Sequence, residues 1–184
     1  MGDARSQHSD FEAMYSEYRL PVLAYCTRRI GPPDANDACA ETFLIAWRRR
    51  TDLPQPPGTL PYLYGIAGKV IANQRRGLAR RTRLETKIKG LGTSPMADPE
   101  TVAVRREQDR IVEKAVKRLR PKDREIVMLY AWEELPRESI AELMGMTKTA
   151  VDQRIHRAYK RLARTLEPIT RTRQSPLTVE EGGT

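Results

Sequence analysis

The sequence predicts an all-α protein: two small helical domains joined by a flexible linker. Apolar residues recur at helical spacing on both sides of a segment rich in glycine, proline and serine. No stretch shows the alternation of apolar and polar residues that is typical of β-strands. A chain of 184 residues is long enough for two small domains. We expect the domains at residues 10–81 and 102–167, with the linker at 82–101.

The first expected helix follows a disordered polar arm at residues 1–9. Asp10 is its candidate N-cap, and its apolar positions continue with a period of 3.6 to the Gly-Pro-Pro sequence at 31–33. Pro21 lies inside this pattern, so it either kinks the helix or begins a new one. Both ends of the helix are therefore predicted, but its continuity is not.

The second expected helix has Asp34 as its candidate N-cap and ends at three consecutive arginines, residues 48–50. Cations are favourable at the C-terminus of a helix, where the backbone dipole is negative. The proline-rich residues 51–59 then predict a loop.

The third expected helix has one apolar face and one basic face. The apolar stripe consists of Leu60, Leu63, Tyr64, Ala67, Val70 and Ile71. The opposite row consists of Lys69, Asn73, Arg76 and Arg80. A solvated basic helix is the alternative interpretation. We favour a nucleic-acid face because an amide that can hydrogen-bond lies within the cationic row.

Residues 136–164 have the pattern of a helix-turn-helix. Gly145 supplies a turn that can require positive φ, and Thr147 can cap the helix that follows. That helix would bury Val151, Ile155, Ala158 and Leu162, while Thr149, Gln153, His156 and Lys160 form its outer row. A helix of this kind fits the DNA major groove, which is about 12 Å wide. An ordinary helical hairpin is the alternative, and the cationic outer face counts against it.

The net charge of +9 favours a polyanionic partner, and the positive charge is concentrated in two places. One concentration lies within residues 60–89 and the other within residues 137–164. Two separate basic patches suggest two contacts with one extended polyanion.

Several other classes of protein have no support in the sequence. No apolar run reaches about 18 residues, and residues 1–10 contain no signal-peptide core, so we expect no membrane insertion. Cys26 and Cys39 do not form a CxxC pattern and are expected to be buried free thiols. No clustered metal ligands or catalytic motif are present, so we expect no metal, no cofactor, no catalytic residues and no enzyme activity. Residues 168–184 lack core residues and are expected to be a disordered tail.

At this point the sequence resembles a known family. DANDACAETFLIAWRRR (34–50) followed by LPYLYGIAGKVIANQRR (60–76) is similar to the sigma-two domain of extracytoplasmic-function (ECF) sigma factors, in the sigma-70 family. KRLRPKDREIVMLYAWEELPRESIAELMGMTKTAVDQRIHRAYKRL (117–162) resembles their sigma-four domain. The order and spacing of these blocks make the resemblance specific.

The resemblance implies a cytoplasmic bacterial protein, nucleoid-associated in holoenzyme, that binds core RNA polymerase and directs promoter recognition, DNA melting and transcription initiation. Core polymerase (the β′ clamp helices and the β flap) and promoter DNA are the implied partners, and an anti-sigma factor is compatible with the family. The implied core-polymerase-binding residues are Asp37, Glu41, Thr42, Phe43 and Trp47. Because part of their helix must pack inside the domain, Phe43 and Trp47 are candidates for core positions as well.

The resemblance also assigns two DNA-binding sets. The set for the minus-ten element is Arg50, Thr51, Asp52, Leu53, Lys69, Asn73, Arg76 and Arg80. The set for the minus-thirty-five element is Lys148, Thr149, Asp152, Gln153, Arg154, His156, Arg157, Lys160 and Arg161. Asp152 replaces a residue that is usually basic, which removes a phosphate contact, although a carboxylate can accept a hydrogen bond from cytosine N4.

Two other functions remain open from the residues. A stand-alone helix-turn-helix repressor or activator would need a dimerisation helix or ligand domain, and neither is evident. A nucleic-acid enzyme would need a cluster of acidic, histidine or cysteine residues, which the sequence lacks.

Overall fold

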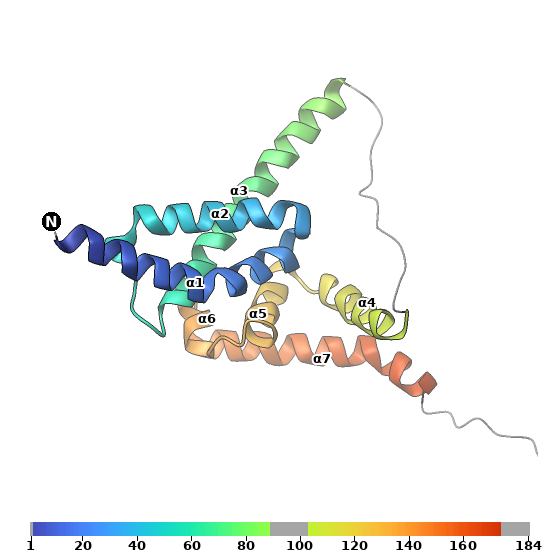
Figure 1. Ribbon diagram of the computed structural model, residues 1–184. Helices are drawn as coiled ribbons and strands as arrows, with labels where there is room; N and C mark the ends of the chain where they lie inside the picture. The colour runs from blue at the N-terminus through green and yellow to red at the C-terminus, as the bar shows by residue number, and fades with distance from the viewer. Residues whose placement is uncertain (1, 89–102, 174–184) are drawn as a thin grey trace, which may run out of the picture. The chain divides into compact units, whose positions relative to one another are not determined.

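The computed structural model describes residues 2–88 and 103–173, and the side chains of residues 8–80 and 110–166. Every regular element in these ranges is helical, which confirms the predicted all-α class. The helices form two packed units, one before and one after residues 89–102 (Figure 1).

The first unit contains three long helices. They are α1 (Gly2–Ile30), α2 (Pro32–Arg48) and α3 (Thr59–Ile88), with a short 3₁₀ turn at Arg50–Asp52. In Figure 1, α1 and α2 lie side by side as a hairpin, and α3 packs across both before its C-terminal half projects beyond them. The buried side chains include Val22, Tyr25, Cys26, Ala38, Phe43, Leu63, Ala67, Val70 and Ile71.

The start of α1 differs from the expected disordered arm at residues 1–9. The helix begins at Gly2 and continues without interruption through Pro21. Contacts at His8 supply a physical reason, because its ring packs edge-on against Trp47, with centroids 5.5 Å apart, and its Nε2 lies 3.2 Å from Glu12. The apolar periodicity of the sequence, which begins after Asp10, gave no indication of these contacts.

Gly31, rather than Asp34, is the N-cap of α2. Gly31 has φ +83°, a conformation that side chains with a Cβ rarely adopt. Pro32 follows as the first helical residue, where its missing N–H removes no helical hydrogen bond. Asp34 lies in the first turn, where its negative charge is favourable toward the helix dipole.

Helix α3 also continues beyond the expected start of the linker at residue 82. It ends at Ile88, and residues 78–88 consist largely of good helix formers such as Leu, Ala, Arg and Glu. The remainder of the expected linker, residues 89–101, lies outside the described residues.

The second unit contains four helices: α4 (Ala103–Lys117), α5 (Pro121–Ala131), α6 (Arg137–Met144) and α7 (Lys148–Arg173). Helices α4 and α5 pack against α7 (Figure 1). The expected core positions Val151, Ile155 and Ala158 are buried, and Leu162 packs partly buried against Leu119, Val127 and Ala158.

Helix α7 extends past the expected domain end at residue 167 and contains Pro168. Once a helix is long, each further residue adds one hydrogen bond, so a single missing amide does not have to end it. The rest of the expected tail, residues 174–184, lies outside the described residues.

The prediction of buried free thiols is confirmed. Cys26 and Cys39 are both free and buried in the first unit. Burial raises the pKa of the Cys39 thiol above its ordinary value, against the opposing effect of the Arg19 charge.

Candidate nucleic-acid interface

The turn between α6 and α7 has the predicted geometry. Gly145 has φ +61°, and its amide bonds to the Glu142 carbonyl at 3.2 Å, which closes the end of α6. The Thr147 hydroxyl then accepts the Ala150 amide at 3.2 Å, as an N-cap does. Ile140 and Val151 are fully buried on either side of this turn. The buried contacts fix the direction in which α7 leaves the turn and leave its outer row in solvent.

The structure divides the expected minus-thirty-five set into two groups. One group is exposed on the outer side of α7: Thr149, Gln153, His156, Arg157, Lys160 and Arg161. The other group makes ion pairs with α5 and α6: Lys148, Asp152 and Arg154. Sequence spacing could not separate these groups, because their partners lie on other helices.

Arg154 belongs to the packing of the second unit. Its Nη1 lies 2.6 Å from Asp123 Oδ1 on α5, and the two side chains are 32% and 14% exposed. A guanidinium held in this way has little freedom to reach a DNA phosphate.

Lys148 is held at the surface by Glu138. The Nζ–Oε1 distance is 2.5 Å. The hydrogen bond from Lys148 is the main reason that the pKa of the Glu138 carboxyl lies below its ordinary value. The same hydrogen bond raises the pKa of the Lys148 ammonium. At neutral pH both groups are charged, and the pair joins the first turns of α6 and α7.

The basic row of α3 is exposed as expected. Lys69, Asn73, Arg76 and Arg80 all lie in solvent, while Leu63, Ala67 and Val70 are buried on the other side of the helix. The guanidinium of Arg76 donates a hydrogen bond to the Asn73 amide oxygen. One face of α3 therefore combines three cations with one amide side chain.

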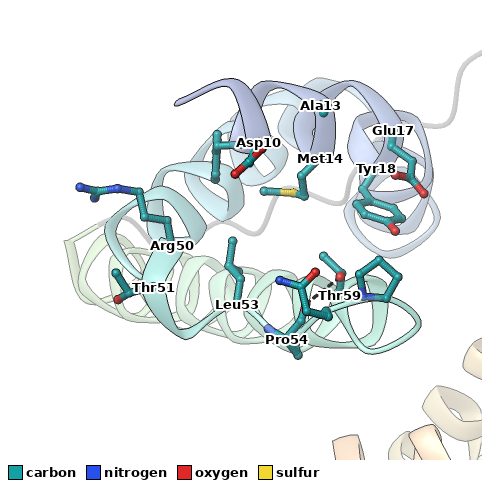
Figure 2. Close-up of a pocket in the computed structure, with 13 residues that line it drawn as sticks. Asp10, Ala13, Met14, Glu17, Tyr18, Arg50, Thr51, Leu53, Pro54 and Thr59 are labelled. Carbon is teal, nitrogen blue, oxygen red and sulfur yellow. Dashed lines mark hydrogen bonds between the residues drawn. The ribbon is translucent and has the colours of Figure 1, made fainter. Parts of the chain in front are cut away.

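The loop after α2 forms one wall of a pocket of about 560 Å³. Figure 2 shows Met14 and Tyr18 of α1 facing Leu53 and Thr59 across this pocket. The Thr59 hydroxyl donates to the Pro54 carbonyl at 2.8 Å, which ties the loop to the start of α3. Burial, with a smaller effect of Glu17, raises the pKa of the Tyr18 phenol, so this side chain is a neutral hydrogen-bonding group at the pocket wall.

Three residues of the minus-ten set, Arg50, Thr51 and Leu53, line this pocket. The Arg50 guanidinium also lies 4.7 Å from the centroid of the Trp47 ring. Asp52 is exposed, accepts a hydrogen bond from the Thr51 hydroxyl at 3.3 Å and does not line the pocket. The loop residues and the α3 row are therefore two distinct parts of the expected set.

The expected core-polymerase-binding set is divided by burial. Asp37 and Glu41 are exposed on α2. Thr42 is fully buried and donates to the Ala38 carbonyl at 2.7 Å. Phe43 is 4% exposed and packs edge-on against Tyr15. Thr42 and Phe43 are thus core residues in this structure, and a direct surface role for them does not fit their burial.

Trp47, the last residue of the expected core-polymerase-binding set, is half-buried. The Trp47 ring packs edge-on against His8 and Phe11 of α1.

Leu44 is an exposed residue of α2 that the sequence did not single out. It is 48% exposed and lies three residues after Glu41, on the same face of α2. Helical spacing alone does not separate this exposed leucine from the core positions of α2.

No group of three or more metal-ligating side chains occurs among the described residues. Within the same ranges, no helix is both long and apolar enough to cross a membrane.

The fold and the exposed faces define an all-helical protein of the nucleic-acid-binding class, with a helix-turn-helix in its second unit. The sequence model for sigma-70 region 4 matches residues 109–162. The ECF RNA polymerase sigma factor SigD of Mycobacterium bovis is 30% identical over 149 residues, which cover 77% of this chain and 69% of SigD. The chain belongs to the extracytoplasmic-function sigma factors of the sigma-70 family, which are not enzymes.

Other relatives are longer than this chain. It is 30% identical to the probable RNA polymerase sigma factor RfaY of Xanthomonas campestris pv. campestris, over 67% of this chain and 32% of RfaY. It is 27% identical to the ECF sigma factor SigG of Mycobacterium tuberculosis, over 94% of this chain and 52% of SigG. The chain thus spans about a third of the first of these relatives and about half of the second.

Two solved structures share the fold. The sigma factor RpoE from Bartonella quintana, in complex with the anti-sigma factor NepR, has a TM-score of 0.65 at 18% identity, over 86% of this chain and 97% of RpoE. CnrH, in complex with the cytosolic domain of CnrY, has a TM-score of 0.62 at 21% identity, over 88% of this chain and 90% of CnrH.

Proposed function

We propose that this chain is a promoter-specificity subunit of RNA polymerase: it binds the core enzyme in the bacterial cytoplasm, recognises the promoter and supports melting of the DNA. The observation that carries the proposal is the presence of an exposed basic face on each of two helical units, on α3 and on α7, in a chain that belongs to the ECF sigma factors. Two such faces suit two promoter elements on one duplex.

The second unit would read the minus-thirty-five element through the exposed group on α7. Gln153 has both a donor and an acceptor for base edges, and Arg157 and Lys160 supply cations for bases or phosphates. Arg154, which the sequence placed in this set, is assigned instead to the packing of α7 on α5 because Asp123 holds its guanidinium.

The first unit would engage the minus-ten element through the α3 row and the loop pocket. Lys69, Arg76 and Arg80 suit phosphate contacts, and Asn73 suits a base edge. Unstacking a base costs a few kcal/mol of free energy, which a pocket can offset with apolar contact and hydrogen bonds. Met14 and Leu53 offer apolar contact in the pocket, and Thr51 offers a hydroxyl.

The polymerase contact is proposed on the exposed face of α2. Asp37, Glu41 and Leu44 lie at a spacing of four and three residues, which places them along one side of the helix. Thr42 and Phe43 would support this face from inside the unit, and Trp47 would fix the α1 segment behind it.

An anti-sigma factor is part of the proposal. The fold shared with RpoE, which was solved in complex with the anti-sigma factor NepR, supports this partner class. Copurification of the chain with a protein that blocks its binding to core polymerase would test it.

Transcription in vitro tests the main proposal. Core polymerase alone should not initiate on duplex promoter fragments, and adding the purified chain should produce transcripts with defined start sites. A stand-alone helix-turn-helix repressor or activator would bind duplex DNA but would not restore initiation to core polymerase. Failure of the chain to assemble with core enzyme in gel filtration, together with unchanged initiation, would exclude the proposed function.

A further inference from the structure

Arg137, which the sequence reasoning assigned to no site, is the first residue of α6 and lies beside α7. Its Nε is 3.2 Å from Asp152 Oδ1 on α7, and its Nη2 donates to the Tyr130 hydroxyl at 3.3 Å. The guanidinium also lies 5.3 Å from the centroid of the Tyr130 ring. Tyr130 is in turn packed edge-on against Tyr159 of α7. Contacts from α5 and α7 therefore hold one side of the Arg137 fork.

Asp152 is 40% exposed, and one of its two carboxylate oxygens lies beside Arg137. Its Oδ1 is buried and accepts no hydrogen bond from the described residues, although the Arg137 cation lies beside it. A buried carboxylate oxygen without a hydrogen bond depends on a nearby cation to offset the cost of leaving water. The Asp152 carboxylate therefore stabilises the Arg137 guanidinium in its observed position.

Arg137 still has donors to offer. Its side chain is 45% exposed, and its Nη1 has no partner among the described residues. The Glu138–Lys148 ion pair joins the first turns of α6 and α7, so Arg137 lies next to the end of α7 that would enter the major groove. Glu138 would otherwise repel a phosphate here, but Lys148 neutralises its charge at a distance of 2.5 Å.

We propose that Arg137 binds a DNA backbone phosphate beside the minus-thirty-five element, and that Asp152 and Tyr130 are positioning residues that orient its guanidinium. The planar fork of arginine suits a phosphate, and a pre-oriented fork loses less side-chain entropy on binding. This inference rests on the proposed function, because it assumes that α7 meets promoter DNA.

Salt-dependent binding tests the assignment. Affinity of holoenzyme for labelled promoter duplex is measured by fluorescence anisotropy at several KCl concentrations, for a panel of duplexes with single base-pair changes in the minus-thirty-five element. Arg137→Ala should weaken all duplexes several-fold by a similar factor and should lower the slope of log K against log [KCl] by about 0.9, the value for one phosphate. Arg137→Lys should restore the slope but only part of the affinity, because an ammonium lacks the fork.

Asp152→Asn separates orientation from base reading. We expect weaker binding, an unchanged slope and the same base preference at every position of the panel. Loss of preference at a single base pair would overturn the proposal, since Asp152 would then be reading that base. An unchanged slope in Arg137→Ala would also overturn it.

Arg118→Ala is the matched control, because it removes one exposed arginine from the turn between α4 and α5. It should leave affinity and slope unchanged. An equal effect in this variant would mean that net charge, and not position, is responsible, and would overturn the assignment. Thermal unfolding of each variant confirms that it is folded before binding is measured.

The two proposals fail in different ways. The same titrations are run with the full chain alone on the duplex panel. If the wild-type chain binds duplex but never joins core polymerase, the proposed function fails while the Arg137 test stands. If holoenzyme forms and initiates but Arg137→Ala has the wild-type slope, only the present inference fails.

Discussion

Arg154 on α7 and Asp123 on α5 form an ion pair with a 2.6 Å separation, and both side chains are less exposed than those of the other ion pairs in the second unit. The pair joins α7, which carries the proposed DNA-binding row, to α5, which packs against it. A residue that the sequence assigned to DNA is thereby part of the support of the site.

The first prediction concerns this pair. Arg154→Ala or Asp123→Ala should each lower the free energy of unfolding by roughly 1 to 2 kcal/mol, because a hydrogen bond between partly buried charges is lost and one charge is left without its partner. Urea denaturation measures the change, and a double-mutant cycle gives the coupling. The exposed pair Lys117–Glu113, also at 2.6 Å, is the control, and Glu113→Ala should cost less than about 0.5 kcal/mol. Equal costs at the two pairs would contradict the supporting role.

The second prediction compares two glycines. Gly145 has φ +61° with open space around its Cα, so Gly145→Ala should destabilise by about 1 kcal/mol through backbone strain alone. Gly77 lies within α3 and also has open space, so Gly77→Ala should stabilise by about 0.5 to 1 kcal/mol. Thermal unfolding of the two variants should give shifts of opposite sign, and shifts of the same sign would refute the turn argument.

The third prediction tests the polymerase contact on α2. Glu41→Lys and Leu44→Asp should each weaken assembly with core polymerase about tenfold or more, because one reverses a charge and the other places a carboxylate in an apolar contact. The control is Glu113→Lys, which makes the same charge change on the exposed surface of α4. Competition for core enzyme against a labelled wild-type chain provides the measurement. Wild-type competition by Glu41→Lys and Leu44→Asp would remove α2 from the interface.

The fourth prediction concerns thiol reactivity. Because burial raises the pKa of Cys39, the thiol is protonated at neutral pH and becomes a thiolate only above its ordinary titration range. Cys39 favours the neutral form in the folded state, so its contribution to stability is present at low pH and is lost as the pH rises above the unfolded thiol pKa. Because both thiols are buried, alkylation of Cys26 and Cys39 should be slow at pH 7 and fast in denaturant. Rapid labelling of the native chain would show that one of these side chains is accessible.

Local sequence patterns were sufficient to predict the helices and the turn between α6 and α7. The period of apolar residues in α3 and α7 predicted which positions are buried, because a helix that packs on one side must repeat that side every 3.6 residues. The glycine–threonine pair at 145 and 147 predicted the turn for a similar reason, since the conformation and the capping hydrogen bond involve only neighbouring residues.

Helix ends were predicted less well where their causes are not local. The first helix begins at Gly2 instead of Asp10, and the contact of His8 with Trp47 joins residues far apart in the sequence. The N-cap of α2 is Gly31 because the following proline suits the first helical position, which outweighed the capping preference of Asp34.

By itself the sequence determined the all-α class, the two concentrations of positive charge and the helix-turn-helix, because periodicity, composition and turn chemistry are properties of neighbouring residues. Only the tertiary structure decided which of the candidate side chains face solvent. Thr42 is fully buried, Phe43 packs against Tyr15 of α1, Arg154 is held by α5, and Asp152 is paired with Arg137 at the start of α6. The physical reason is that the availability of a charged or aromatic side chain depends on partners from other helices, and helical spacing does not specify those partners.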